Sequence, residues 1–253
     1  MSTSKDPTAC VLIIGNEILS GRTKDVNLNF IANRLTELGI RLSEARVIPD
    51  LSHAIVDTVN QCRARYNYVF TTGGIGPTHD DITAVCIAKA FGVPLVRHQP
   101  SVEKMEHYYG DKLNAARLKM ADLPEGSEPI ETRVTSAPGF RIENVYVLAG
   151  VPSIAQAMFD SVAPSLAHGA PVVSRYVEAH MGEGDLADAL TEIQNAFPAV
   201  DLGSYPFFRT GRIGLSVVVK GTDVDAIDGA IEQVVKAVEA LDQTYSVDAV
   251  LEA

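Results

Sequence analysis

Short apolar runs alternate with amphipathic segments along the first part of the chain. Residues 9–14 (ACVLII) form a continuous apolar run that ends at a glycine, as expected for a strand buried on both faces. Residues 42–48 and 68–72 predict two more strands. Apolar residues at helical spacing predict helices over 27–38, 52–65 and 81–91. This alternation predicts an α/β fold with a doubly wound, mostly parallel sheet.

The pattern changes after residue 99. Residues 100–121 predict helix, broken near Gly110, and residues 123–128 (LPEGSE) predict a loop. Two short apolar runs flank Glu143 and Asn144, which is typical of a hairpin, and a helix follows from Pro152 to about Phe159.

A second pattern begins after the segment HGAP at residues 168–171. Strands are predicted over 172–179 and 213–220, and helices over 185–197 and 223–241. We therefore expect one domain over residues 8–168 and a small α+β domain over residues 171–253. The aromatic segment 205–208 (YPFF) is predicted to lie in a loop. Because the small domain has no glycine-rich strand-to-helix loop, we expect it to pack on the first domain or on a second subunit rather than contribute to catalysis.

Composition narrows the classes of partner. The net charge of −11 argues against a nucleic-acid surface, which needs clustered cations, but a small phosphorylated ligand needs only one loop and one helix start. The three cysteines fit no metal template, and we expect reduced thiols in a cytoplasmic protein. The first eight residues lack the apolar segment of a signal peptide, and no apolar run is long enough to cross a membrane.

Residues 71–81 (TTGGIGPTHDD) are the strongest candidate site, because they follow a buried strand and lead into a helix. Glycines at such a strand end let the backbone approach a phosphate. Adjacent carboxylates would repel that phosphate, so Asp80 and Asp81 imply Mg²⁺, Mn²⁺ or Co²⁺. The alternative is a tight turn with Thr78 or Asp80 as a helix cap. The candidate phosphate-binding residues here are Thr72, Gly73, Gly74, Gly76 and Thr78.

Two other strand ends carry acids. Gly15, Asn16 and Glu17 follow the first strand, with Gly15 and Asn16 as further candidate ligand-binding residues, and Asp50 follows the second. Taken alone, Glu17 is equally well explained as a surface acid in a turn, and Asp50 as part of a helix start. The convergence of three strand ends favours Glu17, Asp50 and Asp81 as catalytic residues. Lys112, Arg117 and Lys119 form either a solvated helix face or a cationic group that closes over a phosphate.

Three segments resemble the molybdopterin-binding (MoaB/Mog) domain family. Residues 15–21 (GNEILSG) resemble its G-D/N-E-L/I-L-x-G signature, residues 71–81 its second signature, and residues 150–152 (GVP) the G-V-P of CinA-type members. The chain is similar to short CinA-like proteins and to the domain of this type that accompanies eukaryotic FAD synthetases. The resemblance implies a three-layer αβα domain and a further ligand-contacting segment at Gly150, Pro152 and Ser153.

The resemblance also implies site roles. Asp81 falls where Mog-type proteins carry the aspartate needed for work on the pterin, and Asp50 falls on their second important aspartate. CinA-type domains are described as metal-dependent pyrophosphatases of ADP-ribose, and the comparable domain of FAD synthetases is associated with FAD hydrolysis. CinA proteins carry N-x-K-Q-A-x-L-P where residues 117–124 read RLKMADLP, so Lys119 matches but the Asn and Gln do not. These differences favour the branch associated with FAD synthetases.

Three hypotheses follow. The first is a metal-dependent hydrolase of a nucleotide diphosphate linkage, with ADP-ribose or FAD as substrate. In it Asp80 and Asp81 hold the metal, Glu17 or Asp50 acts on water, and Lys119 neutralises the outer phosphate. The second is an enzyme of molybdenum-cofactor assembly with molybdopterin as ligand, and the third is a non-catalytic binding module. In each case we expect a homo-oligomer.

Overall fold

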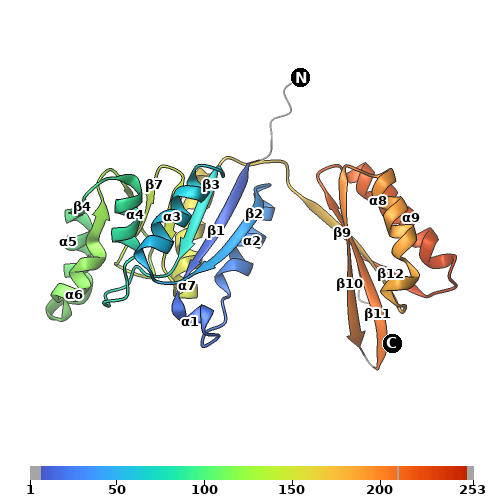
Figure 1. The fold of residues 1–253 in the computed structure, drawn as a ribbon, viewed down its shortest axis with the longest axis horizontal. Coiled ribbons are helices and arrows are strands. Elements are labelled where there is room, and N and C mark those ends of the chain that lie inside the picture. Colours follow the sequence, from blue (N-terminus) through green and yellow to red (C-terminus); the bar gives the residue numbers. More distant parts are fainter. Residues whose placement is uncertain (1–6, 210, 250–253) are drawn as a thin grey trace, which may run out of the picture. The chain divides into compact units, whose positions relative to one another are not determined.

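The structure is a computed structural model that describes residues 7–209 and 211–249 (Figure 1). The described chain divides into two compact units, and the boundary lies between Gly169 and Ala170. Each unit has its own sheet and its own core.

The first unit is built on a six-stranded sheet in the order β2-β1-β3-β8-β7-β6. The neighbours β2, β1, β3 and β8 pair in parallel, and β7 pairs antiparallel with both β8 and β6. The mostly parallel α/β fold predicted from the sequence is therefore confirmed. The strands are β1 (Thr8–Ile14), β2 (Arg41–Ile48), β3 (Tyr68–Thr72), β6 (Glu128–Ile130), β7 (Gly139–Ile142) and β8 (Val145–Leu148).

Helices cover both faces of this sheet. Alternate residues of β1 enter two separate cores, with Leu12 in one and Val11 in the other, which explains the unbroken apolar run. Helices α3 (Ser52–Arg63) and α4 (Thr83–Phe91) pack on the first face, and α2 (Asn27–Glu37) and α7 (Pro152–Val162) pack on the second. No helix in the described part of the chain has the length and apolar character of a membrane span.

A helical insert lies between α4 and the second half of the sheet. A two-stranded antiparallel ladder closes its base, and Val102, Met105 and Ala121 form its small core. The loop predicted over 123–128 is partly wrong, because strand pairing extends into both of its ends. The insert contains β4 (Leu95–Arg97), α5 (Gln99–Tyr109), α6 (Ala115–Leu118) and β5 (Asp122–Pro124), with single 3₁₀ turns before and after α6.

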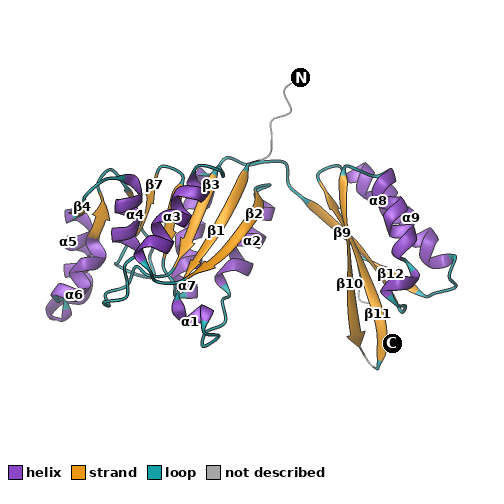
Figure 2. Ribbon diagram, in the orientation of Figure 1, coloured by secondary structure: helices purple, strands orange, loops and turns teal. Residues whose placement is uncertain are grey.

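The second unit has a four-stranded antiparallel sheet in the order β10-β11-β9-β12. Helices α8 and α9 lie on the same side of that sheet (Figure 2). The loop predicted at residues 205–208 is wrong, because this segment belongs to edge strand β10, where a proline costs no ladder bond. The elements are β9 (Val173–Ala179), α8 (Ala187–Ala196), β10 (Val200–Arg209), β11 (Arg212–Gly221), α9 (Val224–Glu239) and β12 (Tyr245–Val247).

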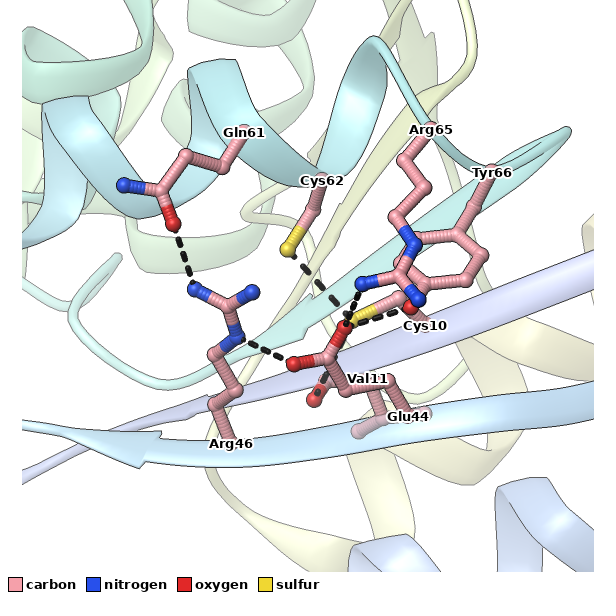
Figure 3. A network of polar contacts seen from close by, with 8 residues as sticks. All are labelled: Cys10, Val11, Glu44, Arg46, Gln61, Cys62, Arg65 and Tyr66. Atoms are coloured by element: carbon pink, nitrogen blue, oxygen red, sulfur yellow. Dashed lines mark hydrogen bonds and ion pairs between the residues drawn. The ribbon is translucent and has the colours of Figure 1, made fainter.

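A polar network joins edge strand β2 to helix α3 (Figure 3). Arg46 Nε donates to Glu44 Oε1 at 2.7 Å, and the Tyr66 hydroxyl donates to the other oxygen of Glu44. These two hydrogen bonds, with Arg46 the stronger influence, hold the pKa of Glu44 below its ordinary value. Behind the network the Cys10 thiol donates to Cys62 Sγ at 3.6 Å, which raises the pKa of Cys10 and lowers that of Cys62. All three cysteines are buried and free.

Replacing Glu44 with glutamine should destabilise the first unit by about 1 kcal/mol at pH 7. The expected loss is small because the ion pair of Arg46 with Glu44 is partly exposed to water. A carboxylate with a lowered pKa stabilises the fold above its unfolded pKa, and this contribution is lost as the pH falls through the folded pKa. Thermal melts of wild type and E44Q should therefore differ at pH 7 and converge well below pH 4. A difference in melting temperature between the two proteins that stays the same at every pH would contradict the role of the Glu44 charge.

Candidate active site

The carboxyl ends of the four parallel strands meet at one edge of the sheet. The helix packed after β1 lies on one face and the helix after β3 lies on the other, although β1 and β3 are neighbours. Such a reversal opens a crevice between two strand ends, and ligands of open α/β sheets bind there. Residues 15–17 and 73–81 follow these two strands directly, so the strongest candidate loops lie at the switch point.

Backbone and side-chain hydrogen bonds fix the glycine loop. The Thr83 hydroxyl donates to the Gly73 carbonyl at 3.0 Å, and the Thr83 N–H donates to the Gly74 carbonyl at 2.9 Å. The Gly73 N–H donates in turn to Leu148 of the neighbouring strand at 3.3 Å. Thr83 is fully buried, so it holds the loop from below and leaves the outer side of the loop to a ligand.

Two of the glycines are required by this geometry. Gly73 and Gly74 have φ values of +100° and +70°, which L side chains rarely adopt. A Cβ on Gly73 would lie 2.1 Å from the Ile14 carbonyl oxygen, and one on Gly74 would lie 2.2 Å from the Thr83 hydroxyl oxygen. Gly150, at the end of the next strand, is also close, because its Cβ would lie 3.3 Å from Gly73 Cα. The three strand ends therefore pack backbone against backbone.

A hollow of about 460 Å³ lies beside the glycine loop, which is within the range of small-molecule sites. We call it the first hollow. Glu17 and Asp81 both line it, so the structure brings these two predicted catalytic acids to one place. The rest of its wall includes residues 73–77 and 149–151 on the sheet side and Tyr109, Arg117 and Met120 on the side of the insert.

Asp80 and Asp81 share one hydroxyl group. The Thr78 Oγ1 lies 2.6 Å from Asp80 Oδ1 and 2.6 Å from Asp81 Oδ2, and the Thr78 N–H also donates to Asp81 Oδ2 at 2.8 Å. A hydroxyl has a single proton and donates to only one of these carboxylates at a time, so the other carboxylate oxygen is open to water or a cation. The Thr78 hydrogen bond is the main reason that the pKa of Asp80 is lowered. Asp80 is exposed, and it lines neither the first hollow nor a smaller hollow that also borders residues 74–76.

Replacing Thr78 with valine should raise the pKa of Asp80 toward its ordinary value, because the hydroxyl that favours the charged carboxylate is removed. A carboxyl-carbon NMR titration measures this directly. The T78S variant is the control, since it keeps the hydroxyl and should keep the lowered pKa. An unchanged pKa in T78V would show that the Thr78 hydroxyl does not serve Asp80.

The third predicted acid has a different position. Asp50 Oδ2 accepts the backbone N–H of Asn16 at 2.8 Å and does not line the first hollow. It therefore orients the loop that carries Glu17. Glu17 itself folds over Gly15, since a Cβ on Gly15 would lie 2.5 Å from a Glu17 carboxylate oxygen. In this structure Asp50 therefore contacts the loop that carries Glu17 rather than the first hollow.

The remaining predicted ligand-binding residues are distributed around the loop. Lys119 lines a second hollow of about 320 Å³, which also borders residues 74–76, together with Thr78 and Asp81. Pro152 and Ser153 begin helix α7 next to Gly150, but only Gly150 lines the first hollow. Thr72 is buried at the end of β3.

From the sequence, Arg117 was expected only as a member of a basic cluster, and no role in the site was predicted for Tyr109. Both residues line the first hollow. Met120 lines both hollows, so it stands between them. The three come from the insert, which meets the glycine loop through tertiary packing. In the sequence, residues 117 and 120 stood out together only because they differ from the Asn and Gln of the CinA-type segment.

The acids fit a cation that takes part of its coordination from the ligand. Among residues 7–209 and 211–249, no group of three or more His, Cys, Asp or Glu side chains could hold a metal ion by itself. Mg²⁺ is commonly held by one or two carboxylates together with water and substrate phosphates. Asp81 and Glu17 on the wall of the first hollow, and the shared hydroxyl of Thr78, match that kind of site.

Family models match both units. Residues 10–168 match the model described as "Probable molybdopterin binding domain", and residues 171–246 match the model described as "FAD synthase, middle domain". The two matches adjoin near the boundary between the compact units at residues 169 and 170.

Similar proteins come from archaea. A protein of Aeropyrum pernix is 35% identical over 212 residues, which cover 79% of this chain and 79% of that protein. A protein of Thermococcus kodakarensis is 33% identical over 246 residues, covering 91% and 95%. The crystal structure titled "the protein CinA with unknown function" from Thermoplasma acidophilum is 33% identical with a TM-score of 0.60, and the match covers 63% of this chain and 98% of that chain.

Proposed function

The chain belongs to the family of the "Probable molybdopterin binding domain", as a CinA-like member, and from this premise we propose that it is a metal-dependent hydrolase of a nucleotide diphosphate linkage. One observation carries the proposal. The glycine loop at the switch point, held by Thr83, borders a hollow whose wall also includes two carboxylates, Glu17 and Asp81. A phosphate loop beside two acids is suited to phosphoryl chemistry rather than to binding alone.

The residues of the chain take distinct roles in this proposal. The loop at residues 73–76 binds the diphosphate through backbone N–H groups. Asp81, oriented by Thr78, would hold the divalent cation, which when bound neutralises charge on the diphosphate. Glu17 accepts a proton from the attacking water, and Asp50 keeps Glu17 in place through Asn16. Asp80 adds negative charge that attracts the cation from the outer side of the loop.

FAD is the first candidate substrate, with ADP-ribose as the second. The match of residues 171–246 to the "FAD synthase, middle domain" favours FAD. A specific observation also keeps a pterin as an alternative ligand, because the model that matches residues 10–168 is described as a molybdopterin-binding domain. Under that alternative the same loop would bind the pterin phosphate, in an enzyme of molybdenum-cofactor assembly.

The test is incubation of the purified full chain with FAD, ADP-ribose and molybdopterin plus ATP, each with Mg²⁺, Mn²⁺ or Co²⁺, followed by chromatography of the products. We expect FAD to yield FMN and AMP only when a divalent cation is present. Adenylylated pterin as the sole product would favour cofactor assembly. Tight binding without turnover of any compound would identify a non-catalytic binding module and contradict the proposal.

A further inference from the structure

The insert at residues 95–124 is anchored as a separate module on the first unit. Its two ends pair as the β4–β5 ladder, and Arg97 forms an ion pair with Asp122 across that ladder. Lys104 forms a second ion pair with Glu131, outside the insert. The insert has its own small core, so its inner wall can change without changing the sheet or the glycine loop.

The insert contributes Arg117 to the wall of the first hollow, and neighbouring residues hold this side chain in place. The Arg117 N–H donates to the Asn114 side chain at 2.9 Å, which fixes the start of α6. The Arg117 guanidinium lies 4.9 Å from the ring centroid of Tyr109, and it donates to the Lys112 carbonyl. Because these contacts leave several of its five N–H donors available, Arg117 can bind an anion without first being ordered.

The charges of the first hollow favour such a basic side chain beside a bound phosphate. The other charged side chains on its wall are Glu17 and Asp81, both acidic. Without Arg117, a phosphate in this hollow would meet two carboxylates and no basic side chain from its wall, and like charges at close range are strongly unfavourable. Lys119 does not fill this role, because it lines the second hollow and not the first.

The two hollows are of different character. The first adds Met158, Ile154 and Tyr109 to Met120, which makes an apolar wall suited to a flat ring. The second is smaller and carries Lys119, Thr78 and His79 beside the loop. Both contain residues 74–76 and Asp81, so the two hollows adjoin along the loop. A ligand with two halves joined by a diphosphate would therefore place one half in each hollow.

We propose that the insert sets the ligand specificity of this site: Arg117 binds the phosphate of the nucleoside monophosphate half whose base lies in the first hollow, and Met120 separates that half from the other half, which lies at Lys119. This inference rests on the proposed function, because it requires a phosphorylated ligand on the glycine loop. Beyond that function, each half of the ligand is assigned to one hollow and to one basic side chain, Arg117 or Lys119.

The test is isothermal titration of AMP, ADP-ribose and FAD, with Mn²⁺ present, into the full chain and its R117Q and K119Q variants. In this assignment AMP occupies only the first hollow. The R117Q variant should therefore bind AMP at least about tenfold more weakly, while the affinity of K119Q for AMP should stay within about twofold of wild type. ADP-ribose spans both hollows, so both variants should weaken it. R117K keeps the charge but loses the planar stacking on Tyr109, and should lie between wild type and R117Q.

The outcomes separate this inference from the proposed function. Wild type that binds neither AMP, ADP-ribose nor FAD would overturn both. Wild type that binds these probes while R117Q binds AMP equally well, or while K119Q is the weaker variant for AMP, would overturn the assignment of the hollows alone. Each variant is first compared with wild type by thermal melting; if R117Q does not fold, the folded R117K variant must show weakened AMP binding, or the inference is wrong.

Discussion

Replacing Gly73 with alanine is expected to destabilise the first unit by about 3 kcal/mol or more and to abolish ligand binding. The new Cβ would lie 2.1 Å from the Ile14 carbonyl oxygen, and both groups belong to the backbone of packed strand ends, so neither has room to move. The φ of +100° adds strain that no rearrangement of the side chain relieves. The loop must therefore separate from β1, and the crevice between the two strands is lost.

Chemical denaturation of the full chain measures this loss. G184A is the matched control, since Gly184 belongs to the second unit, a Cβ there would meet no described atom within 4 Å, and the change should leave stability unaltered. G76A is the informative intermediate: its Cβ would meet only the far end of the Asp81 side chain, at 2.6 Å, so it should fold and bind more weakly. A G73A protein as stable as G184A would show that the strand ends are not packed as described.

Replacing Asp81 with asparagine is expected to lower turnover at least about 100-fold, while the free energy of unfolding changes by less than about 1 kcal/mol. The amide keeps the size of the side chain but removes the negative charge that would hold the cation on the first hollow. Binding of metal in the presence of nucleotide should weaken in parallel. The loss should be largest at low metal concentration, where the affinity for the cation limits the rate.

Hydrolysis of FAD over a range of Mn²⁺ concentrations measures this effect, and D57N, at an exposed position of α3, is the control for loss of one negative charge. D81N and wild type with the same metal affinity and the same turnover would remove Asp81 from the site. If D81N lost turnover but kept metal affinity, Asp81 would act on the substrate rather than on the cation.

Much of the first unit could be predicted from its sequence, because local patterns and buried strands decide it. The apolar run at residues 9–14 identified β1, and the position of the glycine loop after a strand identified the carboxyl edge of the sheet as the candidate site. Residues 205–208 were harder: glycine and proline punctuate β10, and its pairing with β11 is what makes it a strand. Gly214 leaves room for the ring of Phe207 there, a contact that appears only once the two strands are paired.

The inner wall of the site depends on tertiary packing, which spacing alone does not reveal. Residues 117 and 120 are three apart, so they share one side of their helical segment, yet the sequence does not say whether that side meets solvent or the loop. The same limit applies to Asp50, whose place beside the Asn16 N–H depends on the alignment of β1 with β2. Neighbouring strand ends were predictable, but the direction of each side chain was not.

The most direct test is a crystal structure of the full chain with Mn²⁺ and α,β-methylene-ADP, whose phosphorus–carbon link resists hydrolysis. We expect the diphosphate to lie against the backbone N–H groups of residues 73–76, with an anomalous Mn²⁺ peak beside Asp81 and the adenosine in the first hollow. Phosphates bound away from the glycine loop, with Asp81 and Glu17 free of both ligand and metal, would contradict it.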